Sequence, residues 1–204
     1  MPRKKQLSSQ KGQNMPIEKR IWEAIKKLCF FQKGKLWKIA YSKGLTALQL
    51  NILFMLSSVP QKFRTVSFLS SELEVAKPTI SVAVRKLEDK GYIRRKENKK
   101  DRRVVFLELT AKARKILQPA EDVSKFIEDV IADFPEEDKK KVYGMLVDTI
   151  FELQKHNFLK MTRMCISCVN FIPNYKDGKH YCRLIDKYFT SEEVGVDCDY
   201  FKPA

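Results

Sequence analysis

The sequence is poor in glycine and contains no long apolar run. Its 204 residues include seven Gly, and any two of them lie at least ten positions apart. This spacing excludes the G-x-G-x-x-G and P-loop fingerprints of nucleotide-binding proteins. No apolar run approaches the roughly 18 residues of a membrane-spanning helix, and the first residues lead into no secretory signal. We therefore expect a cytoplasmic protein with no membrane partner.

Histidine is also scarce, and its context does not suggest catalysis. Only His156 and His180 occur. Neither stands in a Ser/Cys-His-acid arrangement that would activate a nucleophile. We therefore expect that the chain is not an enzyme.

Basic residues clearly outnumber acidic ones. The 40 Lys and Arg against 25 Asp and Glu give a net charge of +15, which favours a polyanionic partner. Between Lys62 and Arg103, thirteen basic residues stand against six acidic ones. A fifth of the chain thus holds nearly half of the excess charge, as expected for a DNA-binding surface.

The N-terminal part divides into a tail and a helix. Residues 1–15 are basic, contain no acidic residue and predict a disordered arm. From Pro16 to Tyr41, apolar residues recur every three or four positions, which predicts a helix. Cys29 lies on this apolar stripe, and we expect it to be a core residue.

The rest of the first 160 residues follows the order of a winged helix-turn-helix domain. The pattern of Thr46 and Gln49 predicts a capped helix start, and Gly91 is typical of the residue that follows a helix end. The expected elements are helices over 46–59, 66–73 and 78–90, a hairpin with strands over 92–96 and 104–109, a helix from Thr110 that Pro119 kinks or breaks, and a helix from about 136 toward Lys160.

In such a domain one helix enters the major groove of double-stranded DNA, and the hairpin contacts the flanking duplex. Ile80, Val84 and Leu87 form the apolar face of the 78–90 helix. The opposite face and the hairpin give the candidate DNA-binding residues, which are Lys77, Thr79, Ser81, Val82, Arg85, Lys86, Arg94, Arg95, Asp101, Arg102 and Arg103.

Three motifs resemble those of the MarR family of transcriptional regulators, over about residues 16–157. They are Leu45-Thr46-Ala47-Leu48-Gln49, then Lys77-Pro78-Thr79-Ile80-Ser81, and the wing Asp101-Arg102-Arg103 followed by Leu107-Glu108-Leu109-Thr110. The resemblance implies a homodimer that binds a short palindromic operator. The first helix and the last two, about 16–41 and 111–160, would form the dimer interface. A small-molecule effector is a possible further partner.

The same resemblance implies roles for individual residues. Thr79 and Ser81 would face the major groove, Arg103 would enter the minor groove, and Asp101 would orient the wing arginines. Arg102 is the alternative for the inserted residue. Val82 departs from the family, which often has a polar or basic residue at this position.

The last forty residues contain four of the five cysteines. Their spacing is Cys165-x2-Cys168-x13-Cys182-x15-Cys198. A segment this short and polar needs a metal or disulfides to be stable, and four thiolates suit zinc or an iron–sulfur cluster. Two disulfides are the alternative, disfavoured in a reducing compartment. His180 is expected to be exposed. The segment has a net charge of about −1, so we expect no extra DNA-binding element there.

The residues around these cysteines resemble those of high-potential iron–sulfur proteins and related small 4Fe–4S modules. An apolar residue follows the first Cys pair, Leu184 lies two positions after Cys182, and aromatic residues follow Cys198. The resemblance implies a 4Fe–4S cluster, with Zn2+ as the alternative. The side chains that would shield it are Phe171, Tyr181, Tyr200 and Phe201.

The sequence therefore predicts a mainly α fold with a small β-hairpin wing, a helical dimerisation region and a small Cys-rich, metal-bound C-terminal module. The expected divisions are 1–15, 16–160, with the DNA-binding core at about 45–110, and 161–204. The favoured function is a DNA-binding regulator modulated by its metal centre. The alternatives are a regulator that responds to a small molecule and has a structural zinc module, and an electron-transfer or interaction protein on a winged-helix scaffold.

Overall fold

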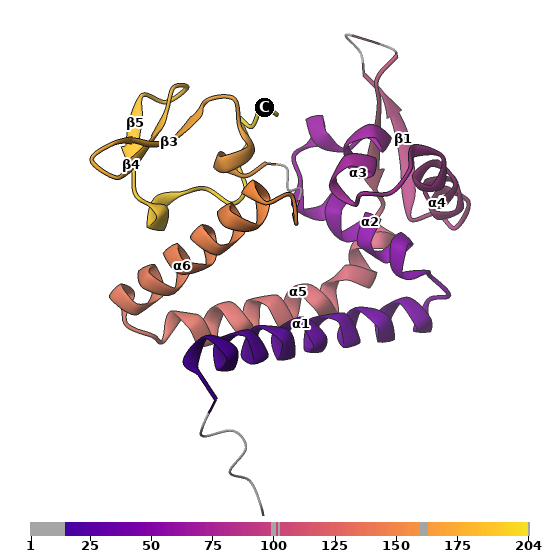
Figure 1. The fold of residues 1–204 in the computed structure, drawn as a ribbon. Coiled ribbons are helices and arrows are strands. Elements are labelled where there is room, and N and C mark those ends of the chain that lie inside the picture. The colour runs from indigo at the N-terminus through magenta and orange to yellow at the C-terminus, as the bar shows by residue number, and fades with distance from the viewer. Residues whose placement is uncertain (1–14, 99–100, 102, 160–162, 204) are drawn as a thin grey trace, which may run out of the picture. The chain divides into compact units, whose positions relative to one another are not determined.

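The computed structural model describes residues 15–98, 101, 103–159 and 163–203 (Figure 1). The predicted N-terminal arm lies almost wholly outside the described residues. The chain divides into two compact units, Met1–Leu50 and Asn51–Ala204. Among the described helices, none is long and apolar enough to cross a membrane.

The first unit contains helix α1 (Ile17–Ser42) and the start of α2 (Ala47–Ser58). The predicted capping pair at the start of α2 is present. The Thr46 backbone N–H donates to Gln49 Oε1 at 3.0 Å, and the Gln49 N–H donates to Thr46 Oγ1 at 3.2 Å. These reciprocal bonds satisfy N–H groups that a helix start leaves without partners.

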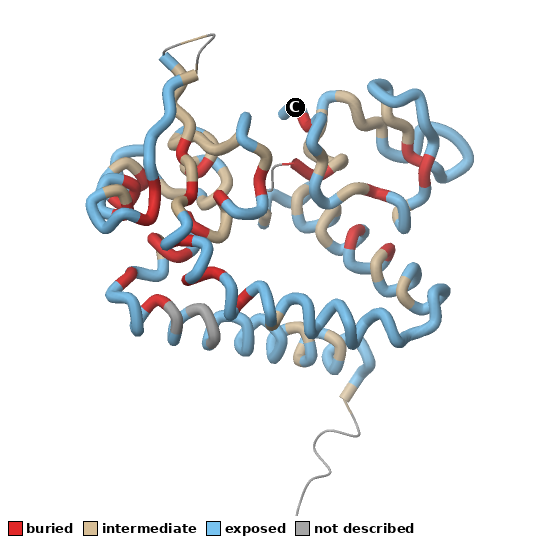
Figure 2. The backbone as a smooth tube through the Cα atoms, turned by 180° about the vertical axis from the view of Figure 1, so that it is seen from behind, coloured by how far each residue is buried: buried red, intermediate tan, exposed pale blue. Residues whose placement is uncertain are grey.

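Most of the described apolar residues of α1 are exposed in the single chain, and exposed residues are pale blue along the backbone in Figure 2. Trp22, Leu28 and Trp37 are 58%, 63% and 66% exposed. Cys29 is exposed too, so the prediction that it is a core residue is wrong for the single chain. The helical periodicity identified an apolar stripe, but periodicity does not say which surface covers it.

The second unit begins its helix-turn-helix with the remainder of α2, followed by η2 (Gln61–Phe63), α3 (Val66–Glu72) and α4 (Lys77–Asp89). Thr65 caps α3 by accepting a hydrogen bond from the Phe68 N–H at 3.2 Å. The core of this region consists of completely buried aliphatic side chains, which include Ile52, Leu53, Leu56, Leu69, Ile80, Val84 and Leu87.

Helix α4 ends where the sequence predicts. Gly91 has a φ of +73°, a backbone conformation that side chains disfavour. This turn brings the Tyr92 N–H to the Leu87 carbonyl at 2.9 Å and directs the chain into the wing.

The wing is an antiparallel hairpin of β1 (Ile93–Glu97) and β2 (Val105–Leu109). Ile93 lies opposite Leu109, and both are buried. The Leu107 N–H also donates to the Arg64 carbonyl at 2.7 Å, so the residue after η2 supports the far edge of β2. Lys99, Lys100 and Arg102 of the predicted tip lie outside the described residues.

Helix α5 (Ala111–Ala132) starts at Thr110, as predicted, and runs through Pro119 without ending. The sequence predicts a kink or a break at Pro119. The predicted break is wrong, because α5 continues through this residue. Proline removes one helical hydrogen bond, but Leu117 and Ala120 on either side are buried. Their packing holds the helix together. The last long helix, α6 (Glu136–Lys155), follows Pro135 and ends five residues short of the expected Lys160.

The C-terminal segment folds as a small sheet on α6. Its elements are η3 (Cys165–Ser167), β3 (Phe171–Lys176), β4 (Lys179–Cys182), β5 (Lys187–Phe189) and η4 (Ser191–Glu193), with antiparallel strand order β3-β4-β5. Its core consists of Phe189, Val194 and Val147 of α6. Tyr143 of α6 donates to the Val194 carbonyl at 2.6 Å.

Candidate nucleic-acid interface and cysteine cluster

One face of α4 is exposed and polar, as a groove-reading helix requires. Ile80, Val84 and Leu87 are completely buried, and the opposite face carries the candidate residues. Of these, Ser81 is half-buried, and the exposed ones are Lys77, Thr79, Val82, Arg85 and Lys86. Val82 is 56% exposed, and it offers DNA only an apolar contact.

The wing arginine is oriented by the aspartate two positions before it. Arg103 Nε lies 3.1 Å from Asp101 Oδ1, and its backbone N–H donates to the same oxygen at 3.0 Å. These hydrogen bonds lower the pKa of Asp101. The Arg103 side chain is nevertheless 92% exposed, so the guanidinium is held in direction while it stays accessible. Arg102 lies outside the described residues.

The two predicted arginines of β1 are exposed and held by carboxylates. Arg94 lies 2.7 Å from Glu108 of β2, and Lys96 lies 2.8 Å from the same carboxylate. Hydrogen bonds from Lys96 and Arg94 lower the pKa of Glu108. Arg95 lies 2.9 Å from Glu88 of α4. The DNA contacts assigned to Arg94 and Arg95 stay predictions.

Two glutamates that no sequence motif predicted form ion pairs with the basic side chains of this surface. Glu108 lies directly opposite Arg94 in the hairpin register, and opposite charges at such positions attract. The alternation of β1 and β2 could have revealed this pair. The Glu88–Arg95 pair joins a helix to a strand and has no local sequence signal.

Backbone hydrogen bonds place the four C-terminal cysteines in the same part of the C-terminal module. Cys165 and Cys168 share the η3 turn, in which the Cys168 N–H donates to the Cys165 carbonyl at 3.0 Å. The Cys165 N–H donates to the Gly195 carbonyl at 3.0 Å, three positions before Cys198. Cys182 lies opposite Phe171, which follows the first pair closely. All four are free thiols and half-buried.

The thiols are electrostatic neighbours. The pKa of Cys165 is raised by burial and by the other three cysteines, and a hydrogen bond from Gly195 opposes this rise. Four thiolates so placed repel one another, and a cation would relieve that repulsion. In the described part of the chain, however, no three His, Cys, Asp or Glu side chains form a ready metal-binding group. The chemistry of the donor set fits a thiolate-bound metal, and the metal stays a prediction.

Gly195 leaves room for the first thiol. A Cβ at this position would lie 3.3 Å from Cys165 Sγ, a tight contact that would displace the sulfur. Asn170 Nδ2 lies 3.8 Å from Cys168 Sγ. These neighbours restrict where the sulfur atoms lie.

Three expectations for residues around the cysteines are wrong. His180 is 8% exposed rather than open to solvent, because its ring packs between Phe171 and Phe189, and burial lowers its pKa. Tyr200 is 67% exposed and shields nothing in the single chain. Tyr181 stacks on Tyr175 at a centroid distance of 5.0 Å, on the sheet face opposite Cys182. Phe201 is buried and Phe171 packs on the core, as expected.

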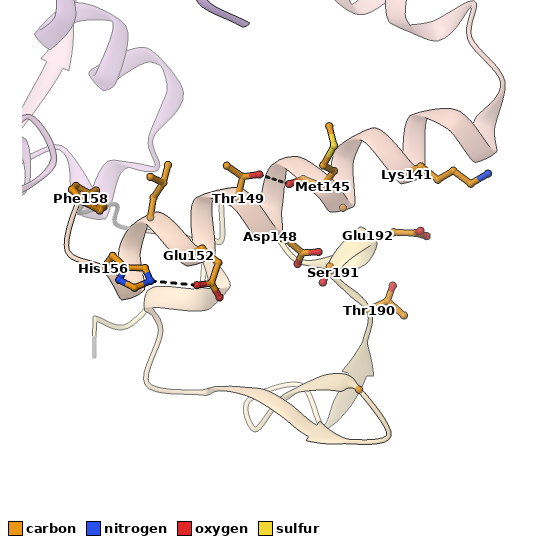
Figure 3. A pocket seen from close by; sticks show the side chains of 13 residues that line it. Lys141, Met145, Asp148, Thr149, Glu152, His156, Phe158, Thr190, Ser191 and Glu192 are labelled. Carbon is orange, nitrogen blue, oxygen red and sulfur yellow. Dashed lines mark hydrogen bonds and ion pairs between the residues drawn. The ribbon is translucent and has the colours of Figure 1, made fainter. Parts of the chain in front are cut away.

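A shallow groove of about 900 Å3 separates part of α6 from η4 (Figure 3). Asp148 and Glu152 of α6 line it on one side, and Ser191 and Glu192 on the other. Gly144 of α6 allows η4 to approach closely, since a Cβ at this position would lie 3.2 Å from the Glu192 Cγ. The groove lies beside the surface where the C-terminal module packs on α6.

The elements 47–109 and their exposed basic faces define a winged helix-turn-helix protein of the DNA-binding class. The MarR family model matches residues 43–104. An uncharacterized HTH-type transcriptional regulator, YwoH of Bacillus subtilis (strain 168), is 31% identical over 98 residues, which are 48% of this chain and 69% of that protein. The chain therefore belongs to the MarR family of transcriptional regulators, and it is a regulator rather than an enzyme.

One solved structure shares the fold. A MepR mutant from a multidrug resistant S. aureus clinical isolate is 21% identical with a TM-score of 0.53, over 66% of this chain and 97% of that one. The transcriptional regulator Tm0710 from Thermotoga maritima is 25% identical with a TM-score of 0.48, over 70% and 99%. Another MepR mutant, bound to an oligodeoxyribonucleotide, is 21% identical with a TM-score of 0.45, over 66% and 98%.

Proposed function

We propose that the chain is a cytoplasmic homodimer that binds a specific DNA operator, and that a metal centre held by Cys165, Cys168, Cys182 and Cys198 modulates this binding. The favoured centre is a 4Fe–4S cluster, with Zn2+ as the alternative. The observation that carries the proposal is that the cysteine module packs directly on α6, a helix expected to form the dimer.

The DNA-binding part rests on the exposed faces of α4 and the wing. Lys77, Thr79 and Arg85 present charge and hydrogen-bonding groups above a buried apolar face. Arg103 projects from the wing, directed by Asp101. This pairing of a helix with an arginine-tipped hairpin suits contacts in the major and adjacent minor grooves.

Dimerisation rests on apolar surface that the single chain leaves exposed. Phe126 of α5 is 67% exposed, and Val142 and Met145 of α6 are 53% and 44% exposed. Trp22 and Trp37 of α1 are exposed by similar fractions. Large exposed apolar side chains on a helix are typical of a protein interface, and a second copy of the chain is the partner we propose.

The proposed modulation of DNA binding is supported by contacts that the cysteine module makes with α6 and with η2. Cys165 and Cys182 pack against the cluster that contains Val147 of α6. In the other direction, the Arg163 guanidinium lies 5.1 Å from the ring centroid of Phe63 in η2, and η2 leads to the segment that pairs with β2. A structural change at the thiols would therefore alter contacts at α6 and beside the wing.

The test is preparation without oxygen, followed by the absorption spectrum and by iron, sulfide and zinc quantification. DNA affinity is then measured for loaded and metal-stripped protein, on a duplex selected from a random-sequence pool. We expect iron and sulfide at about four each per chain, and an affinity that changes at least about fivefold on stripping.

Cys168→Ser should lower the metal content and reproduce the stripped affinity, and Cys29→Ser is the matched control outside the cluster. Sedimentation gives the oligomeric state in parallel. One zinc per chain with unchanged DNA affinity after stripping would refute modulation and support a structural zinc module. Protein without bound metal would refute the metal centre altogether.

A further inference from the structure

Three tyrosines form a cluster of contacting rings on the outer face of the C-terminal sheet. Tyr181 of β4 lies 5.0 Å from Tyr175 of β3 and 4.9 Å from Tyr188 of β5, between ring centroids. Tyr175 and Tyr188 are themselves 5.8 Å apart. Tyr175 is 51% exposed and Tyr188 is 45% exposed, so the cluster presents aromatic surface to solvent instead of filling the module's core.

The backbone directs these rings outward. Tyr181 lies opposite both Ile172 and Tyr188, and its neighbours His180 and Cys182 face the core side. The β3–β4 register shifts between Ile172 and Lys176, and Asn174 within that stretch has a φ of +48°. Such an irregularity re-aims a side chain, and here it brings Tyr175 over Tyr181.

Cations flank the tyrosines. Lys176 lies directly opposite Lys179 in the sheet register, and like charges in this position repel. Alternation along β4 places Lys179 on the same side as Tyr181, and Arg183 directly follows the strand. All three cations are exposed, and no carboxylate among the described residues forms an ion pair with any of them.

Three of the six acidic groups of the module are engaged away from the tyrosines, so its net charge does not describe this face. Asp197 and Asp199 pair with the buried Arg163. Glu193 pairs with Lys187 and caps η4 through the Thr190 N–H. On the tyrosine face, Asp186 accepts a hydrogen bond from the Tyr181 hydroxyl at 2.8 Å, and Asp177 lies in the tight turn between β3 and β4. The face therefore keeps a cationic excess that the whole-segment charge hides.

We propose that this tyrosine face binds single-stranded nucleic acid, with bases stacked on the exposed rings and phosphates held by Lys176, Lys179 and Arg183. Aromatic side chains beside cations on a sheet are the combination that single-strand binding uses. The facing lysines Lys176 and Lys179 favour a polyanion over an apolar or proline-rich peptide. The site is separate from α4 and the wing, and it does not depend on which metal the cysteines hold.

The test uses the full chain and a fluorescent oligonucleotide of about 12 thymidines, with an oligouridine of equal length as the second probe. Arg103→Ala is present throughout to weaken the winged-helix contribution. Tyr188→Ala should reduce single-strand affinity about fivefold or more, because a stacked base contributes about 1–3 kcal/mol by alanine substitution. Tyr188→Phe keeps the ring and should stay within about twofold. Without Arg103→Ala, Tyr188→Ala should leave affinity for the selected duplex unchanged.

Lys176→Gln with Lys179→Gln is the second variant, because both side chains are exposed and their loss should not unfold the sheet. This double variant should reduce the slope of log single-strand affinity against log salt concentration by about 0.7 for each lost phosphate contact. Thiol reactivity of the four cysteines confirms that each variant is folded. Single-strand affinity that is unchanged in both sets of variants overturns the proposal, as does binding of a proline-rich peptide in place of the oligonucleotides.

Discussion

The Nε of Arg95 on β1 lies 2.9 Å from a carboxylate oxygen of Glu88 near the end of α4. This ion pair links the candidate recognition helix to the wing. Both side chains are partly exposed, at 42% and 35%. Its contribution to stability is therefore small.

Glu88→Gln should lower the free energy of unfolding by less than about 1 kcal/mol. It should nevertheless raise amide hydrogen exchange in β1, because the strand loses its tie to α4. Urea unfolding and hydrogen exchange of Glu88→Gln, Arg95→Gln and the double variant measure the coupling. A coupling free energy of zero would contradict the role assigned to this pair.

Arg103→Ala should weaken binding to the selected duplex about tenfold or more and leave dimerisation intact. If the lost contact is to phosphate, the slope of log affinity against log salt should fall by about 0.9. Fluorescence anisotropy at several salt concentrations measures both quantities. Lys125→Ala on α5 removes the same charge away from the wing and is the control. Equal affinity of Arg103→Ala and wild type at physiological salt would show that the wing assignment is wrong.

Glu108 should stabilise the hairpin in a pH-dependent way. Hydrogen bonds from Lys96 and Arg94 place its pKa below the ordinary value of 4.5. Its stabilising contribution is therefore full above that value and is lost as the pH falls through the lower pKa of the folded state. At neutral pH, Glu108→Gln should cost about 1 kcal/mol of unfolding free energy, and this difference should shrink in acid. Glu97→Gln is the control in the same hairpin, and a difference that grows in acid would refute the assignment.

Thr110 joins the wing to α5. Its hydroxyl accepts a hydrogen bond from the Ala113 N–H at 3.3 Å and donates one to the Gly91 carbonyl at 2.8 Å. Thr110→Ala should therefore cost about 1–2 kcal/mol, which corresponds to a fall of roughly 2–8 °C in thermal midpoint. Calorimetry of Thr110→Ala and Thr110→Ser checks this. Serine keeps the hydroxyl and should retain most of the stability, so an equal loss in both variants would argue against the cap.

Gly195→Ala should reduce the metal content of protein prepared without oxygen. The new Cβ would lie 3.3 Å from Cys165 Sγ and would displace that sulfur. Gly34→Ala is the matched control, because its Cβ would meet nothing within 4 Å. Metal quantification per chain gives the comparison. A full metal content in Gly195→Ala would show that Cys165 does not need this space.

Local sequence signals predicted the positions of most helices and strands. Thr46 and Thr110 cap helices at the expected positions, and Gly91 ends α4 where a left-handed residue is needed. Such signals depend on groups within a few residues of one another, so a single sequence carries them. Pro119 shows their limit, because a local helix breaker is overruled by the packing of its neighbours.

The sequence by itself determined the order of helices and hairpin, the basic character of α4 and the wing, and the gathering of four cysteines in one short segment. Only the tertiary structure decided that Glu88 holds Arg95, that His180 is buried, and that Tyr181 joins Tyr175 and Tyr188 outside the module's core. The physical reason is separation along the chain. Periodicity and capping act over one or two turns, whereas ion pairs between elements and the choice of buried face depend on how distant segments pack.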